Sequence, residues 1–297
     1  MHEKPKHFIK RRLVKIKINS FMNRKLITIT LAFLLLSVIY LGYKQATTGY
    51  FIEKDIDLRG GNLITISFSD ANYQEISRLR DALEKKYEVS AYLTTSITGI
   101  QLSVETYTEN IENLIDEINS TLKIKEYEIS EISPKLSSEV LKEVANGIIF
   151  AFLAMALVIF ILFRVPIPSF AVVISAFTDL VGALFLMNIL GIKLSLITFT
   201  ALLMLLGYSV DTDILLTTRV LKERGKFDEQ YRKALKTGLT MTLTSLVALA
   251  SIVFVSGYNS VFGKLATVLI LGLLVDIPST WIQNAIILDI YKEKHGL

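Results

Sequence analysis

The chain has 297 residues, 52% of them hydrophobic, and a mean hydropathy of +0.48, which is too apolar for an ordinary soluble domain and indicates a membrane protein. It contains no cysteine, which excludes disulfides, zinc-thiolate sites and thiol nucleophiles. Most of the formal net charge of +4 comes from the first 25 residues, whose single acid is Glu3 and whose nine basic residues are Lys4, Lys6, Lys10, Arg11, Arg12, Lys15, Lys17, Arg24 and Lys25. Because basic residues directly before a span mark a cytoplasmic segment, we expect residues 1–25 to form a cytoplasmic tail rather than a nucleic-acid-binding arm.

The first apolar run covers residues 26–43, LITITLAFLLLSVIYLGY, and carries no charge. Its length is close to the minimum that crosses a bilayer as a helix. No small-x-small cleavage pattern follows it, since the sequence continues KQATTGYF. We therefore predict a first transmembrane helix that stays in the protein as an anchor.

Residues 44–141 are polar and resemble a soluble domain. Alternation of apolar and polar residues predicts strands, and apolar residues at a spacing of three and four predict helices. The predicted order is strand, helix, strand, strand, helix, strand, at residues 62–68, 73–87, 88–95, 99–105, 111–122 and 125–133. This is the order of a ferredoxin-like βαββαβ module, an α+β fold with two layers.

Five more apolar runs follow in residues 142–297, and each is long enough to cross the hydrocarbon core as a helix. They cover residues 144–163, 170–190, 194–218, 239–258 and 265–291. The sequence therefore predicts a polytopic α-helical membrane protein with six transmembrane helices and one domain between the first two.

The distribution of basic residues predicts the orientation of the spans. The loop at residues 219–238 has seven, namely Arg219, Lys222, Arg224, Lys226, Arg232, Lys233 and Lys236. The two short loops on the other side have one each, Lys193 and Lys264. We expect a multi-pass protein of the cytoplasmic membrane whose N- and C-termini are cytoplasmic and whose ferredoxin-like domain is extracytoplasmic.

Five segments, in the expected order, resemble motifs of the SecD/SecF family of protein-export membrane proteins. DIDLRGG, at residues 55–61, resembles the acidic, double-glycine motif that opens the outer domain, and its residues Asp57, Gly60 and Gly61 are the candidate loop. GYSVDTDILLTTRV, at residues 207–220, resembles the signature of the fourth span. The other three are at residues 132–165, 177–185 and 234–246. The single compact domain is more similar to SecF than to SecD, and the motif wording suggests an archaeal member.

This resemblance implies an accessory subunit of the Sec translocase that is related to the resistance-nodulation-division transporters. It implies a SecD-like partner, a SecYEG-type channel and unfolded secretory polypeptides as clients, together with use of the proton gradient. In bacterial SecF the acid of the fourth-span motif falls where Thr212 stands, and in SecD it falls where Asp211 stands. The role of the fourth-span acid is therefore assigned first to Asp211 and second to Asp213.

Four aspartates lie within the apolar runs, where an ionisable residue is a functional hypothesis by default. They are the proton-relay candidates Asp211, Asp179, Asp213 and Asp276. Residues two apart on a helix point about 200° apart, so Asp211 and Asp213 cannot face one partner. We expect Gly207 to admit a neighbouring helix and Asp211 to be the buried acid that faces Asp179. We expect Asp213 to lie nearer water or to be hydrogen-bonded to its own helix. Asp276 precedes the helix-breaking Pro278, whose freed carbonyl is a further polar group.

Other interpretations stay open at this stage. The acids are also compatible with hydrogen bonds between helices in a passive scaffold that steadies SecD and the channel. Asp179 and Asp211 are formally compatible with an intramembrane aspartyl protease, but the Gly-x-Gly-Asp motif of such enzymes is absent. A small-molecule exporter of the same superfamily would need a larger outer domain. We do not expect an enzyme, a cofactor or a metal site. The 57–61 loop is interpreted first as a tight turn into a strand and second as a client-binding loop.

Overall fold

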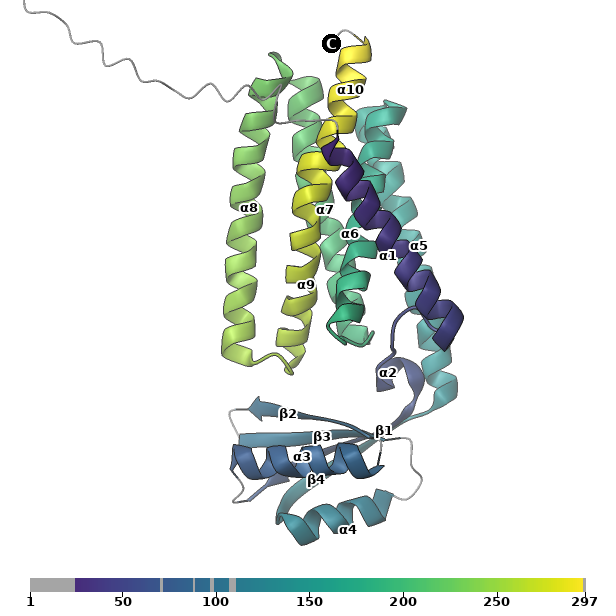
Figure 1. The fold of residues 1–297 in the computed structure, drawn as a ribbon, viewed down its shortest axis with the longest axis vertical. Helices are drawn as coiled ribbons and strands as arrows, with labels where there is room; N and C mark the ends of the chain where they lie inside the picture. The colour runs from purple at the N-terminus through teal and green to yellow at the C-terminus, as the bar shows by residue number, and fades with distance from the viewer. Residues whose placement is uncertain (1–24, 70–71, 88, 97–98, 107–110, 296–297) are drawn as a thin grey trace, which may run out of the picture.

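A computed structural model of the chain describes residues 25–69, 72–87, 89–96, 99–106 and 111–295 (Figure 1). Apart from Lys25, the predicted basic tail lies outside the described residues. In this part of the chain six helices are long and apolar enough to cross a membrane, and an α+β domain lies between the first and the second of them. The predicted fold class is therefore confirmed.

The spanning helices are α1 (Leu26–Thr48), α5 (Pro134–Phe163), α6 (Pro166–Ile189), α7 (Leu196–Lys222), α8 (Phe227–Ser256) and a sixth that is made of three parts. Its parts are α9 (Val261–Pro278), a π-helical segment (Ser279–Asn284) and α10 (Ala285–His295). Local sequence explains several starts. Pro166 occupies the first turn of α6, where no intrahelical N–H is needed, and Ser195 forms a capping box with Thr198 at the start of α7.

The domain has strands β1 (Gly61–Phe68), β2 (Ser90–Ser96), β3 (Gly99–Thr106) and β4 (Ile124–Ile132), with helices α3 (Tyr73–Tyr87) and α4 (Ile111–Thr121). The sheet order is β2-β3-β1-β4, and every neighbouring pair is antiparallel. The predicted βαββαβ order is confirmed. Both helices pack on one face of the sheet through a core that includes Ile64, Ile66, Leu102, Ile76 and Ile118 (Figure 1).

The double-glycine loop connects the domain to the membrane helices. Short helix α2 (Ile56–Arg59) ends at Gly60 and Gly61, whose φ angles of 83° and 129° lie in the left-handed region that favours glycine. The loop is thus a turn that leads directly into β1. Just before it, the amide of Asp55 donates to the carbonyl of Leu194 at 2.7 Å, so the loop is bound to the α6–α7 connection.

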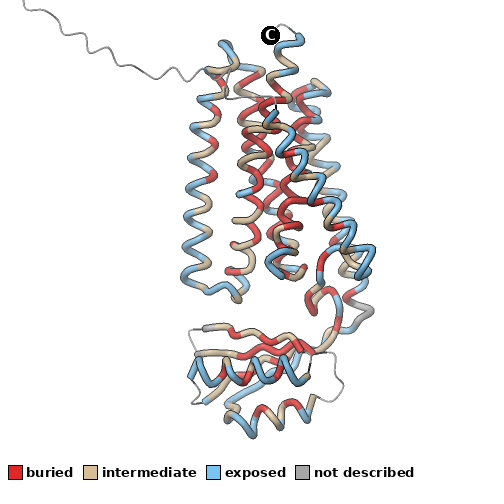
Figure 2. The backbone as a smooth tube through the Cα atoms, in the orientation of Figure 1, coloured by how far each residue is buried: buried red, intermediate tan, exposed pale blue. Residues whose placement is uncertain are grey.

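Helices α6, α7 and α9 form the interior of the membrane segment, while α1, α5 and α8 present mostly exposed side chains (Figure 2). Small residues allow the inner helices to approach closely. A Cβ atom added at Gly182 would lie 2.7 Å from the side chain of Val275, and one added at Gly272 would lie 2.3 Å from Leu205. This close packing leaves polar side chains of the inner helices without access to water.

Candidate functional site

Three aspartates lie in the interior of the membrane segment, one from each inner helix. Asp179 on α6, Asp213 on α7 and Asp276 on α9 are each 0% exposed. A buried carboxylate requires hydrogen-bond donors, because its water shell has been removed. The donors found here are mainly serine and threonine hydroxyls, and they connect the three helices.

Asp179 accepts hydrogen bonds from two other helices. The Ser209 hydroxyl of α7 donates to Oδ2 of Asp179 at 2.5 Å, and the Ser279 hydroxyl of the π-helical segment donates to Oδ1. The same Ser279 oxygen lies 3.1 Å from the carbonyl of Asp276. Asp179 is therefore the point at which α6 contacts both α7 and the broken sixth span.

Asp276 is bound mainly by threonine. Thr212 Oγ1 of α7 lies 3.2 and 3.3 Å from the two carboxylate oxygens, and Thr280 Oγ1 donates to Oδ1 at 3.0 Å. The two threonine oxygens are 3.4 Å apart. Thr212, at the position where the bacterial motif has its acid, is thus a hydrogen-bonding partner of a neighbouring acid.

Asp213 has a different environment. The Asn284 side-chain amide donates to its Oδ1 at 2.7 Å, whereas Oδ2 has no hydrogen-bond partner among the described residues. The amide oxygen of Asn284 likewise has no partner there. Asp213 and Asn284 thus share a hydrogen bond, and one oxygen of each side chain keeps hydrogen-bonding capacity within the described residues.

The structure contradicts the predicted geometry of Asp211. Asp211 is exposed and lines an apolar groove of about 350 Å³ between α5 and α7, together with Met155, Gly207 and Ile214. Nothing among the described residues lies within 4 Å of a Cβ added at Gly207, so no close helix contact is made at this glycine. The buried stripe of α7 instead follows the spacing of three and four from Ser209, which includes Asp213 and excludes Asp211.

Two expectations are therefore wrong: Asp211 does not face Asp179, and Asp213 does not lie near water. Asp211 and Asp213 do point to different sides of α7, but Asp213 lies on the inward side and Asp211 on the outward side. Gly207 is exposed, whereas the buried polar residues Ser209, Thr212 and Thr217 mark the inward face.

Several residues of this site were not singled out from the sequence. They are Ser209, Thr212, Ser279, Thr280, Gln283 and Asn284, all of them buried. A signal was present: after Asp276 the polar residues recur at positions three, four, seven and eight, DxxSTxxQN, which places them on one face of a helix. Gln283 extends the stripe to α6, because its amide donates to Thr178 Oγ1 at 3.1 Å.

The double-glycine loop lies away from this cluster, at the domain end of the helices. Asp57 is half-buried in α2. Burial, and secondly the carboxylate of Asp55, raise the pKa of Asp57 above its ordinary value, while Lys264 and a hydrogen bond from the Leu196 backbone oppose this rise. The loop and the cluster are therefore two separate sites.

The cluster combines three carboxylates with neutral donors only. None of the ion pairs between described residues involves Asp179, Asp213 or Asp276, and no metal-binding group of three acidic, histidine or cysteine side chains is found in the described ranges. A carboxyl group that is hydrogen-bonded to hydroxyls is able to take up or release a proton, and the direction of its hydrogen bonds changes when it does so.

Comparisons with known proteins agree with this architecture. A family model described as "Protein export membrane protein SecD/SecF, C-terminal" matches residues 110–294. The chain is 37% identical over 284 residues to the protein-export membrane protein SecF of Methanolacinia petrolearia, covering 94% of this chain and 97% of that relative. It is 39% identical over 275 residues to SecF of Methanocaldococcus jannaschii, covering 89% and 94%.

The crystal structure of SecDF from Thermus thermophilus, described as a translocon-associated membrane protein, has the same fold. The TM-score is 0.68 at 18% sequence identity, and the match covers 92% of this chain but 38% of that one. The match of the family model to residues 110–294 shows that a chain with this fold is a protein-export membrane protein of the SecD/SecF class. Within this class the chain belongs to the SecF family, whose matching members are mostly archaeal.

Proposed function

We propose that this chain is a subunit that assists the Sec translocase together with a SecD-like subunit and uses the proton gradient to do so. The observation that carries the proposal is the buried cluster of Asp179, Asp213 and Asp276, in which hydroxyls bind Asp179 and Asp276 and the Asn284 amide binds Asp213 across α6, α7 and the broken sixth span. A passive scaffold has no need of three buried carboxylates without a basic partner, because apolar side chains fill such an interior at lower cost.

The proposed coupling follows from charge and hydrogen bonding. Three carboxylates in one dry site repel one another when ionised, so a proton taken up by one of them weakens that repulsion. A protonated carboxyl also donates a hydrogen bond, which reverses the direction of its contact with a hydroxyl. Each proton that enters or leaves therefore favours a different packing of α6 and α7 against α9, and helix packing in turn positions the domain.

We also propose that a transmembrane helix of the SecD-like subunit covers the groove between α5 and α7. A carboxylate that faces lipid costs about 2.5–3.5 kcal/mol, and Asp211 is exposed in the middle of an apolar groove. The match to SecDF covers only 38% of that chain, which leaves a large part of the assembly to a partner. Asp211 is assigned to this contact, and the buried cluster to proton exchange.

The orientation is proposed from the basic loops: both termini are cytoplasmic and the domain is extracytoplasmic. An outward-facing domain is placed to meet unfolded secretory polypeptides as they leave a SecYEG-type channel. Because the chain has no cysteine, a single Lys123→Cys variant reports the side directly. Labelling of intact cells by a membrane-impermeant maleimide is expected, and labelling only after lysis would reverse the topology.

The experiment that tests proton use is proton uptake by proteoliposomes that hold the chain with its SecD-like partner and an unfolded client. Asp213→Asn and Asp276→Asn are expected to abolish uptake, because an amide cannot exchange the proton. Glu223→Gln is the matched control, since Glu223 lies just past α7 at the surface and pairs with Arg219. Equal uptake by the wild type and both cluster variants would favour the scaffold interpretation instead.

Asp211→Asn separates the two roles. We expect it to weaken association with the SecD-like subunit while leaving proton exchange by the assembled pair in place. Loss of uptake with normal assembly would move Asp211 into the proton path. The protease interpretation is not supported by this geometry, because Asp179 and Asp211 do not face each other.

A further inference from the structure

The face of the sheet opposite α3 and α4 is not open along its whole length. On β3, every residue from Leu102 to Thr106 is buried, although alternate residues point to opposite faces. Leu102 and Val104 face the domain core, so Glu105, 3% exposed, is covered from the other side. The cover is provided by the α6–α7 connection and by the α8–α9 connection with the start of α9.

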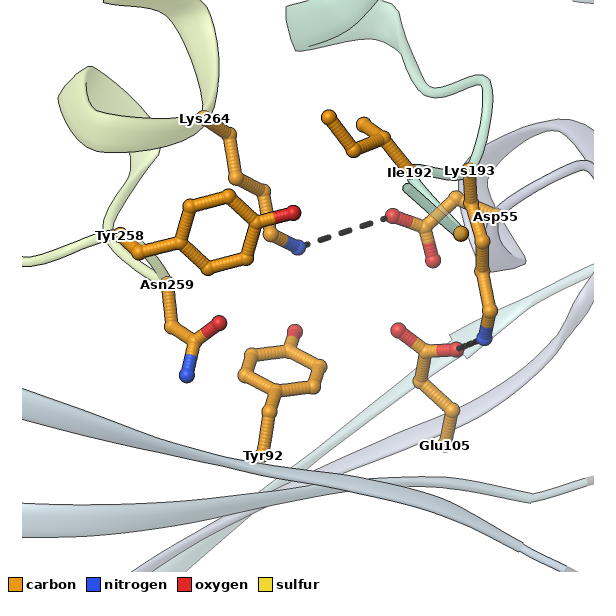
Figure 3. A pocket seen from close by; sticks show the side chains of 9 residues that line it. Asp55, Tyr92, Glu105, Ile192, Lys193, Tyr258, Asn259 and Lys264 are labelled. Atoms are coloured by element: carbon orange, nitrogen blue, oxygen red, sulfur yellow. Dashed lines mark hydrogen bonds and ion pairs between the residues drawn. The ribbon is translucent and has the colours of Figure 1, made fainter. Parts of the chain in front are cut away.

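Side chains from both parts line a cavity of about 140 Å³ at this junction (Figure 3). Lys193 Nζ contacts Glu105 Oε2 at 2.8 Å and Ser90 Oγ at 2.9 Å. The Asn259 side-chain amide donates to the carbonyl of Leu93 on β2 at 3.1 Å. These contacts connect the domain to two different loops of the membrane segment.

Lys264, at the start of α9, completes the junction. Its Nζ lies 4.5 Å from the ring centroid of Tyr92 on β2 and 3.8 Å from the carboxylate of Asp55 (Figure 3). The contacts from Lys193, Asn259 and Lys264 are polar, and they surround a cavity that Ile192 of the apolar core also lines. A surface of this kind separates at little cost, unlike an interface of close-packed apolar side chains.

We propose that this junction, called the seat below, binds the outer domain reversibly and that its stability depends on pH through Glu105. At low pH the domain stays bound to the membrane segment, and at high pH it is released. The proposal is independent of proton use by the buried cluster, since it concerns only groups outside the spans.

The groups that face Glu105 come from every element around it. Lys193 approaches from the α6–α7 connection, Asp55 from the segment before α2, Tyr92 from β2 and Lys264 from α9. Asp57 on α2 adds a further acid nearby. Three acids thus share the site with two lysines, and one acid is in excess.

The pKa of Glu105 agrees with this excess of one acid over the two lysines. Burial, and then the neighbouring carboxyl of Asp55, raise the pKa of Glu105 to about 7, although Lys193 acts in the opposite direction. When the domain leaves the seat, Glu105 returns to water and its pKa falls toward the ordinary value of 4.5. The seated state therefore binds more protons than the released state between these two values.

The direction of the pH dependence follows from this larger number of protons bound in the seated state. A group whose pKa is higher in the seated state stabilises that state fully when the pH is below its pKa in the released state. This stabilisation is lost as the pH rises through its pKa in the seated state. The seat is thus most stable on the acid side and weakens as the pH rises through about 7.

The test is a distance measurement by double electron–electron resonance on the full chain in nanodiscs. Spin labels are placed on Lys123→Cys in the domain and Val261→Cys at the start of α9, both exposed sites in a chain without native cysteine. We expect one narrow distance at pH 5.5 and a second, broader population that grows between pH 6 and pH 8.5. An unchanged distribution over this range would overturn the proposal.

Two variants assign the effect to Glu105. Glu105→Gln is permanently neutral, so its distribution is expected to stay narrow at every pH. Lys193→Gln removes the cation that favours ionised Glu105, so the transition is expected to move to higher pH. Glu126→Gln, on the exposed strand β4, is the matched control and is expected to behave like the wild type. Wild-type pH dependence in Glu105→Gln would also overturn the assignment.

Discussion

At the scale of single residues, two threonines of α7 differ only in their surroundings. Thr212 and Thr217 are both buried, but the Thr212 hydroxyl contacts the carboxylate of Asp276, whereas that of Thr217 has no partner among the described residues. A hydroxyl that binds a buried carboxylate is expected to stabilise the fold, and one without a partner is not.

Thr212→Val is therefore expected to lower the stability of the membrane segment by about 0.6–1.7 kcal/mol, the usual range for a hydrogen bond between membrane helices. Valine keeps the shape of threonine and removes the hydroxyl, which also lies 2.8 Å from the Ser209 carbonyl of its own helix. Thr217→Val is the matched control and is expected to be neutral or stabilising. Thermal denaturation in detergent measures both, and equal effects of the two substitutions would show that the Asp276 contact contributes nothing.

The sequence identifies the three acids of the cluster, but its pattern predicts the wrong acid of α7 as the buried one. Any carboxylate in an apolar run is detectable, because its cost in lipid is large. The inward side of α7 is indicated by a weaker signal, the spacing of Ser209, Thr212 and Thr217. Gly207 alone indicates the opposite side. The donors to Asp179 come from α7 and the sixth span, and such a contact between helices is not contained in the pattern of any one of them.

At the scale of elements, α8 packs most closely on the π-helical segment at Gly238. A Cβ added at Gly238 would lie 2.2 Å from Cζ2 of Trp281 and 2.7 Å from its Cη2. The indole is only 4% exposed, and Tyr231 donates to the Trp281 carbonyl at 2.9 Å and contacts its ring. The ring therefore has little space into which it can retreat.

Gly238→Ala is expected to destabilise the protein by about 1–3 kcal/mol, as overpacked cores do. The matched control is Gly207→Ala, since a Cβ at Gly207 meets nothing within 4 Å. That substitution is expected to stabilise the helix by about 0.5–1 kcal/mol through backbone entropy. Melting temperatures of the two variants in the same detergent give the comparison, and a Gly238→Ala protein as stable as wild type would mean that α8 moves aside freely.

The sequence predicted each spanning helix but not the π-helical segment. Pro278 indicated a break in the sixth span, because proline lacks the N–H that an α-helix requires. The kind of break is set by tertiary contacts: Ser279, Thr280 and Asn284 reach three different carboxylates of the cluster. Wider turns of this type are frequent at functional sites, and local propensity does not encode them.

At the scale of the whole molecule, the groove around Asp211 predicts where a partner lies. Val158 on α5 lines this groove and is 59% exposed, whereas Val255 on α8 is 82% exposed and lies outside it. A photo-crosslinking residue at Val158 is expected to capture the SecD-like subunit in membranes, and the same residue at Val255 is expected to capture it far less. Equal capture at both positions would place the partner elsewhere.

Helix α5 follows β4 with almost no connecting residues, and it has 30 residues. At 1.5 Å per residue it is about 45 Å long, roughly 15 Å more than the hydrocarbon core. It is thus a rigid lever with one arm in the bilayer and the other attached to the domain. A tilt of about 10° about the point where the helix leaves the hydrocarbon core moves the end of this outer arm of roughly 15 Å by about 3 Å, so a change of helix packing in the interior is passed directly to the domain.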